Sequence, residues 1–97
     1  MPNYIEPADV NSPRRYWTLL MVLDPGSEGE AALCIGRWDG EVRLGMRWNG
    51  SEENVLGNPQ SRGIPTWFII PAGKYSNAII ESLSPEMKQM ARNFMPA

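Results

Sequence analysis

Large apolar residues alternate with charged residues or glycine along residues 41–48, and such alternation is typical of a β-strand with two different faces. The pattern Arg-Trp-Asp/Asn-Gly occurs at residues 37–40 and again at 47–50. Asp-Gly and Asn-Gly readily adopt the positive φ angles that a type I′ turn needs at both central residues. Residues 41–48 are therefore predicted to form a strand between two tight turns, paired with a strand that ends at Trp38.

The turn at Asp39-Gly40 fixes the register, because Trp38 then lies opposite Glu41 and every other pair follows by counting outward. One predicted face is apolar apart from Arg37, whose head can reach water, and comprises Ala31, Leu33, Ile35, Val42, Leu44, Met46 and Trp48. The other, called the small-residue face below, comprises Ala32, Cys34, Gly36, Trp38, Glu41, Arg43, Gly45 and Arg47. We expect the first face to be core and the second to be a shallow floor. The register is least secure at Gly36 and Gly45, because glycines inside strands often mark bulges.

Two further strands are predicted. Residues 15–23 form a nearly continuous apolar run, which is typical of a strand covered on both faces. Residues 66–70 form a short β-prone run that Pro71 ends. Residues 51–65 are rich in Asn, Gly, Glu and Pro, and their length indicates a functional or mobile loop.

The C-terminal part changes to a helical period. Ser84 and Pro85 are typical of a helix start, and the apolar residues after them recur at helical spacing: Met87, Met90, Ala91 and Phe94. Residues 76–83 are predicted to form a shorter preceding helix. The sequence thus predicts an α+β fold, an antiparallel β-meander of about four strands or a small half-open barrel, with one C-terminal amphipathic helix.

The N-terminal residues differ from the rest in their proline content. Residues 1–14 contain three prolines, which prevent a regular helix or an inner strand. We therefore expect an extended N-terminal arm at 1–14, followed by a single small α+β domain at 15–97.

The net charge of the chain bears on which kinds of partner it can bind. The 97 residues carry nine Lys or Arg against eleven Asp or Glu, a net charge of −2, whereas proteins that bind nucleic acid through its phosphates are usually basic. Nucleic-acid binding is therefore not expected. Seven of the nine basic residues are arginine, whose planar guanidinium suits paired hydrogen bonds to carboxylate or phosphate.

The residues that many enzymes and metal sites use are scarce. Histidine is absent and Cys34 is the only cysteine in the sequence, so neither a catalytic triad of the usual kind nor a zinc site is expected. We expect no enzymatic activity, no cofactor and no metal, with Cys34 as a small residue that fills the sheet. A lone cysteine suits a reducing compartment. The sequence also lacks a signal peptide and an apolar run of ~20 residues, so we expect a cytoplasmic protein without a membrane segment.

The remaining candidate is a recognition surface on the small-residue face. Small side chains leave room for a flat group to approach the backbone, and arginines at the rim can pair with its carboxylate or phosphate. The predicted site residues are Trp38, Arg43, Arg47, Asn58, Gln60, Ser61 and Arg62. A competing interpretation is that the small residues let the C-terminal helix or another subunit pack closely, with Arg43 or Arg47 paired to the chain's own carboxylates. The other tryptophans, Trp17, Trp48 and Trp67, are predicted to be core.

Two function classes fit these features. The first is a non-catalytic protein-interaction module, a small soluble acidic protein that acts by binding a partner surface, as an inhibitor or adaptor does. Its partner is expected to be another protein or a second copy of the chain. The alternative is a binding domain for an anionic small molecule such as a nucleotide. In both cases Arg43, Arg47 and Arg62 are expected to converge on one anion-accepting surface, and Arg47 is expected to be dispensable for the fold.

Overall fold

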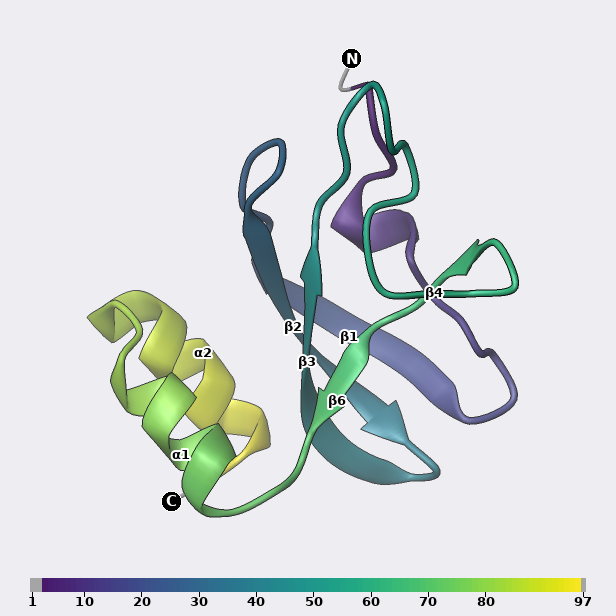
Figure 1. Ribbon diagram of the computed structural model, residues 1–97. Coiled ribbons are helices and arrows are strands. Elements are labelled where there is room, and N and C mark those ends of the chain that lie inside the picture. The colour runs from purple at the N-terminus through teal and green to yellow at the C-terminus, as the bar shows by residue number, and fades with distance from the viewer. Residues whose placement is uncertain (1–2, 97) are drawn as a thin grey trace.

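The structure is a computed structural model that describes residues 3–96. Within this range it contains a four-stranded antiparallel sheet in the order β1-β2-β3-β6 and two α-helices, so the α+β prediction is confirmed. The elements are β1 (Trp17–Asp24), β2 (Ala31–Trp38), β3 (Glu41–Trp48), β6 (Phe68–Ile70), α1 (Lys74–Glu81) and α2 (Pro85–Phe94) (Figure 1). The sheet is open and does not close into a barrel.

The register of β2 and β3 is the predicted one. Trp38 lies opposite Glu41, and the pairing continues without a shift to the last pair of the two strands. The turn residues Asp39 and Gly40 both have positive φ, 51° and 86°, as a type I′ turn requires. The irregularities expected at the strand glycines occur instead in β1, whose register with β2 shifts after Leu19 and after Val22. The division into two faces therefore holds along the whole β2–β3 pair.

The helices cover the apolar face. Its core consists of Leu23, Leu33, Ile35, Leu44, Ile80 and Ala91. The predicted cap of α2 is confirmed, since the Ser84 hydroxyl accepts a hydrogen bond from the backbone N–H of Met87 at 3.3 Å. The helix predicted over 76–83 is also present, beginning two residues earlier as α1. No helix among residues 3–96 is long and apolar enough to cross a membrane.

Two aromatic side chains predicted to be inward are exposed. Phe94 is 38% exposed because it stands at the end of α2 and lines a cavity at the sheet edge. Trp48 is 56% exposed although it belongs to the apolar face. The core under the helices includes Met46 at its margin but not Trp48, so Trp48 lies beyond the part of the sheet that the helices cover. The prediction of Trp48 as core is therefore wrong, whereas Trp17 and Trp67 are buried as predicted.

The small-residue face is buried except near the Asp39-Gly40 turn, which corrects the expectation of an open floor. A second core lies on this side and consists of Val10, Trp17, Ala32, Cys34 and Trp67. A Cβ atom added to Gly36 would lie 2.2 Å from the ring of Trp17, and one added to Gly45 would lie 3.3 Å from the Cβ of Trp67. The space expected for a flat ligand is therefore filled by the chain's own tryptophans.

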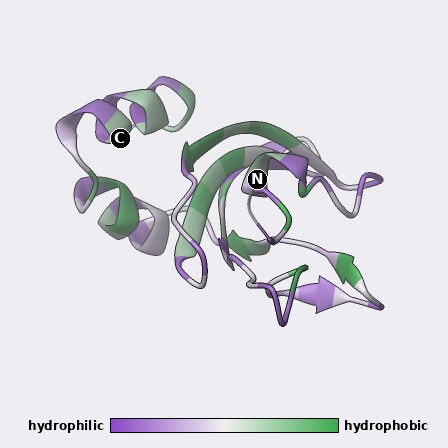
Figure 2. Cartoon of the chain, turned by 90° about the horizontal axis from the view of Figure 1, so that it is seen from above, coloured by the Kyte–Doolittle hydropathy of each residue, from purple (hydrophilic) through white to green (hydrophobic). Residues whose placement is uncertain are grey.

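The N-terminal segment helps to build this second core. It contains a short 3₁₀ turn (Pro7–Asp9) and buries Val10. The indole N–H of Trp67 donates to the carbonyl oxygen of Val10 at 2.7 Å, and the backbone N–H of Leu19 donates to the Asn11 side chain at 3.0 Å. These bonds hold Val10 and Asn11 against the sheet, on the side opposite the helices (Figure 2).

The long segment after β3 contains a small hairpin that the sequence pattern does not reveal. Its strands are β4 (Gln60–Ser61) and β5 (Ile64–Pro65). The turn residues Arg62 and Gly63 have positive φ angles of 54° and 77°. Two-residue strands are too short to show an alternation of polar and apolar positions, so residues 51–65 resemble a plain loop in the sequence.

Candidate functional site

The structure separates the seven predicted site residues. Arg47 is buried, Trp38 is half-buried and Arg43 lines a cavity at the sheet edge, while Asn58, Gln60, Ser61 and Arg62 are exposed in the long segment after β3. The cavity lined by Arg43 and the one lined by Arg62 share no residue. The expected convergence of Arg43, Arg47 and Arg62 on one surface is therefore wrong.

Arg47 is an internal structural residue with 1% of its surface exposed. Its guanidinium donates to the carbonyl oxygen of Thr66 at 2.6 Å and to the carbonyl oxygen of Leu56. It also lies 6.0 Å from the ring centroid of Trp67, within the range of a cation–π contact. Burial lowers the pKa of Arg47, and backbone carbonyls, not the carboxylates of the competing interpretation, receive its hydrogen bonds. Arg47 therefore holds the long segment against the sheet and is not available to a ligand.

Cys34 is expected to react with a thiol reagent only when the protein unfolds. Its side chain is fully buried, and burial raises the pKa of its thiol far above the usual value, opposed in part by a backbone hydrogen bond with Gly45. The thiol thus stays neutral in the folded protein, whereas in the unfolded chain it ionises above about pH 8.5. Timed modification in native buffer should be far slower than in denaturant. Modification at the rate of a free peptide thiol would contradict this burial.

The same raised pKa gives a pH dependence of stability. A group whose pKa is higher in the folded state stabilises the fold below its unfolded pKa and loses that contribution as pH rises above it. Above about pH 8.5 the free energy of unfolding of the wild type should fall more steeply than that of Cys34→Ala, by up to about 1.4 kcal/mol per pH unit. Denaturant titrations between pH 7 and 10 measure this difference in slope. Equal slopes would show that the thiol ionises in the folded state.

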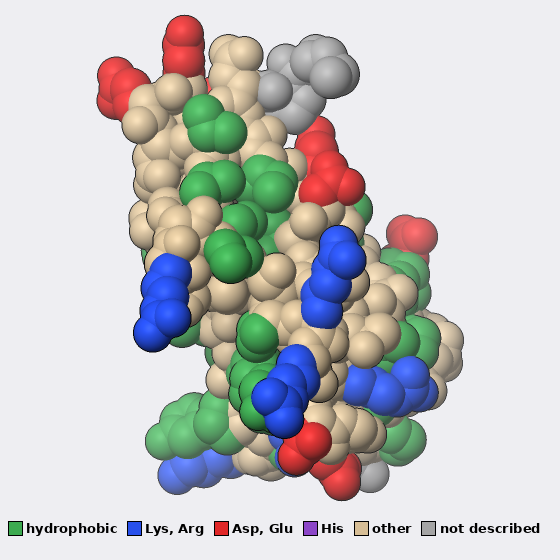
Figure 3. Space-filling model, turned by 90° about the vertical axis from the view of Figure 1, so that its right-hand side faces the viewer, with side chains coloured by type: hydrophobic (Ala, Val, Ile, Leu, Met, Phe, Trp, Pro, Cys, Tyr) green, Lys and Arg blue, Asp and Glu red, His purple; other side chains and the backbone are tan. Residues whose placement is uncertain are grey.

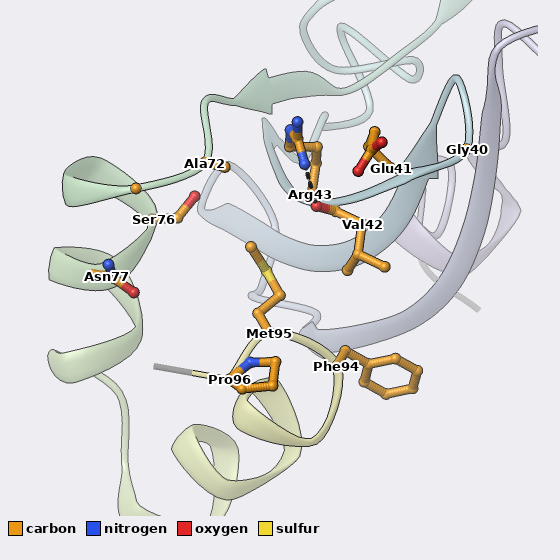
Figure 4. Close-up of a pocket in the computed structure, with 11 residues that line it drawn as sticks. Gly40, Glu41, Val42, Arg43, Ala72, Ser76, Asn77, Phe94, Met95 and Pro96 are labelled. Carbon is orange, nitrogen blue, oxygen red and sulfur yellow. Dashed lines mark hydrogen bonds between the residues drawn. The ribbon is translucent and has the colours of Figure 1, made fainter.

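A cavity of about 440 Å³ lies at the sheet edge, where the pairing of β6 with β3 stops. It is lined by Gly40, Glu41, Val42, Arg43, Ala72, Gly73, Ser76, Asn77, Phe94, Met95 and Pro96 (Figure 4). Arg43 donates to the carbonyl oxygen of Val42 at 2.8 Å, so its guanidinium is folded back on its own strand. The carboxylate of Glu41 opposes its charge, and the Ser76 hydroxyl already donates to the carbonyl oxygen of Pro71 at 2.8 Å. This mixed lining gives no preference for an anion.

A second cavity, of about 310 Å³, lies between the N-terminal segment and the β4–β5 hairpin. It is called the arm–hairpin groove and is lined by Ser12, Pro13, Arg14, Ser61, Arg62, Ile64 and Thr66. Arg14 and Arg62 are the only charged residues of this lining. Both ion pairs within residues 3–96 are made by Glu81, so in this part of the chain neither arginine is paired with a carboxylate. Ile64 is 52% exposed, and the groove therefore combines two available cations with an apolar side chain.

A second arginine, Arg15, and the aromatic residue Tyr16 follow Arg14 in the chain. The guanidinium of Arg15 lies 5.5 Å from the ring centroid of Tyr16, which is 45% exposed. The rings of Tyr16 and Trp38 have centroids 5.6 Å apart. On the side of the molecule seen in Figure 3, the Lys and Arg side chains lie in the middle and lower parts, where acidic side chains also occur, and the upper end shows acidic side chains alone. Arginine, tyrosine and tryptophan are enriched among the residues that dominate protein–protein binding energy.

The sequence prediction identifies Ser61 and Arg62 of this groove but misses Arg14. The available signal is the run Arg14-Arg15-Tyr16 just before the apolar residues of β1. This run does not predict a binding site by itself, because the groove forms only where the N-terminal segment lies beside the hairpin. The groove exists only through that packing, which joins residues about fifty positions apart.

The groove is suited to recognition. Guanidinium groups bind carboxylate or phosphate oxygens through paired, charge-assisted hydrogen bonds. Within residues 3–96 there is no group of three or more Cys, Asp or Glu side chains placed to hold a metal ion. The chemistry that the described lining offers is therefore binding of an anion beside an apolar contact.

Comparison of this chain with protein-family models, with curated proteins and with solved structures finds no match.

Proposed function

We propose that the protein is a non-catalytic interaction module that binds an acidic segment of a partner protein in the arm–hairpin groove. The observation that carries this proposal is the pair Arg14 and Arg62, one from each wall of the groove, with no acidic residue in the lining. The half-exposed Ile64 of the same lining supplies an apolar contact.

The expected energetics are those of a short, charge-assisted recognition site. A hydrogen bond to a charged group contributes about 1.5–3 kcal/mol, and covering Ile64 adds at most about 2 kcal/mol. The exposed Tyr16 beside Arg15 extends the contact outside the groove. The chain has a net charge of −2, so the local positive charge of the two groove arginines, rather than the overall charge, would attract the acidic segment.

One alternative is supported by the adjacent, tilted rings of Tyr16 and Trp38. Aromatic rings beside arginines also suit an anionic small molecule with a ring, such as a nucleotide. Thermal melts with nucleotides and with inorganic phosphate separate the two functions, because a ligand present at a hundred times its dissociation constant adds about 2.7 kcal/mol of stability. A stabilisation by nucleotide that the double variant below abolishes would favour the small-molecule alternative.

The double variant Arg14→Glu/Arg62→Glu is expected to lose binding of acidic peptides selected from a display library on the wild-type protein. Each single reversal should weaken binding at least tenfold, because it replaces an attractive charge with a repulsive one in the same groove, equivalent to about 1.4 kcal/mol or more. Titration of the selected peptides by calorimetry gives the affinities.

Arg37→Glu is the matched control, since Arg37 is exposed and belongs to the opposite face of the sheet. It makes the same charge change outside the groove and should leave the affinity nearly unchanged. Both residues of the double variant are exposed, so thermal melts should match the wild type. Selected peptides that bind the double variant as well as the wild type, or a library that yields no acidic peptides, would contradict the proposal.

A further inference from the structure

The apolar face of the sheet continues beyond the helices as a pair of exposed aromatic side chains. Trp48 is 56% exposed and Phe68 is 55% exposed. Phe68 lies opposite Met46 in the β3–β6 pair, and Trp48 lies two residues further along β3, so all three share one face. Met46 packs against the helix-covered core, and the two aromatic rings therefore extend that core into an uncovered apolar patch.

This patch lies at the acidic end of the sheet. The β1–β2 connection (residues 25–30) and the β3–β4 connection (residues 49–59) lie at that end and contain four acidic residues and no Lys or Arg: Glu28, Glu30, Glu52 and Glu53. They are joined to each other, since the backbone N–H of Asn49 donates to the carbonyl oxygen of Glu30 at 2.9 Å and that of Gly29 to Gly50 at 3.2 Å. The upper end of the molecule in Figure 3 shows acidic side chains and no basic ones.

We propose that Trp48 and Phe68, with the acidic connections beside them, form a docking surface for a cationic segment of a partner protein that inserts an apolar side chain. The two aromatic rings supply the apolar contact, and aromatic residues are enriched at the centres of interfaces. The surrounding carboxylates select for Lys and Arg and repel acidic segments. This surface shares no residue with the arm–hairpin groove and has the opposite charge, so it stands whether or not the groove binds an acidic segment.

Two peptides with the same apolar pattern test this inference. One is a 16-residue amphipathic peptide of lysine and leucine, and the other replaces every lysine with glutamate. Proton–nitrogen NMR spectra report on the indole N–H of Trp48, which is assigned by comparison with Trp48→Phe. The lysine peptide is expected to shift the Trp48 indole signal and the backbone signals of residues 46–53. The glutamate peptide should leave them in place.

Variants establish whether the binding uses these residues. Trp48→Ala and Phe68→Ala should each weaken binding of the lysine peptide at least fivefold, and Glu52→Lys/Glu53→Lys at least tenfold. Glu41→Lys, a charge reversal at the opposite end of β3, should leave the affinity unchanged. All five of these positions are exposed, and thermal melts confirm that the variants remain folded.

Three results would overturn the inference. The first is a Trp48 signal that does not respond to the lysine peptide. The second is binding that survives both Trp48→Ala and the double charge reversal. The third result is a shift of the Trp48 signal with protein concentration alone that Arg62→Glu removes, because the occupant would then be the basic groove of a second copy.

Discussion

Replacing Arg47 with alanine is expected to destabilise the fold by about 4 kcal/mol. The carbonyl oxygens of Thr66 and Leu56 would lose their hydrogen bonds, and a buried group left without a partner costs about 1–3 kcal/mol. The Arg47 stem also packs inside the molecule, with 1% of the residue exposed, so truncation leaves a cavity. Urea titration of the two proteins measures the difference. This expectation replaces the sequence-based one that Arg47 is dispensable for the fold.

Two further substitutions separate the causes. Arg47→Met keeps most of the side-chain volume but no donor, so the difference between the methionine and alanine variants reports the packing of the stem. Arg47→Lys keeps the charge but cannot span both carbonyls in the same planar geometry, and its stability should fall between those of alanine and wild type. Arg43→Ala is the matched control, because Arg43 is half-buried and bonds only within its own strand, and it should cost about 1 kcal/mol or less. Equal losses at positions 43 and 47 would show that Arg47 does not anchor the long segment.

Replacing Gly36 with alanine is expected to destabilise the fold by about 3 kcal/mol, at the upper end of the range for an overpacked core. The added Cβ would lie 2.2 Å and 2.3 Å from two ring carbons of Trp17 and 2.7 Å from the carbonyl oxygen of Thr18. Trp17 is buried, and the contacting atom of Thr18 is its backbone carbonyl oxygen. Neither group can move away from the added methyl unless β1 separates from β2. Thermal or denaturant unfolding gives the magnitude.

Gly45→Ala is the graded comparison, since its added Cβ would meet the sulfur of Cys34 at 2.8 Å and the Cβ of Trp67 at 3.3 Å. A side-chain sulfur can shift more easily than backbone, so Gly45→Ala should cost less than Gly36→Ala. A double-mutant cycle of Gly36→Ala with Trp17→Phe should show a favourable coupling of about 1 kcal/mol or more, because the smaller ring removes the clashing atoms. A nearly neutral Gly36→Ala would mean that the indole of Trp17 does not lie against β2.

The sequence alone determines the local features of this fold. The Asp39-Gly40 turn sets the register of β2 and β3, because few residues adopt positive φ and the side-chain period of a strand then assigns every position to a face. The cap at Ser84 and the helical spacing after it locate α2 for similar reasons. These features depend on neighbours in the chain, and for that reason a single sequence is sufficient to predict them.

Only the tertiary structure decides what covers each face. The period of a strand tells which side a residue faces but not which distant segment packs against it. Gly36 and Gly45 have the same appearance in the sequence whether they receive a ligand or the rings and backbone of the chain itself, and here Trp17 and Trp67 occupy the space. Arg47 likewise stands between apolar residues in the sequence, as a surface arginine of a strand would. It is nevertheless buried, because the carbonyl oxygens of Thr66 and Leu56 accept hydrogen bonds from its guanidinium. Arg14 and Arg62 form one groove because the N-terminal segment folds back beside the hairpin, a contact between distant parts of the chain that no local pattern encodes.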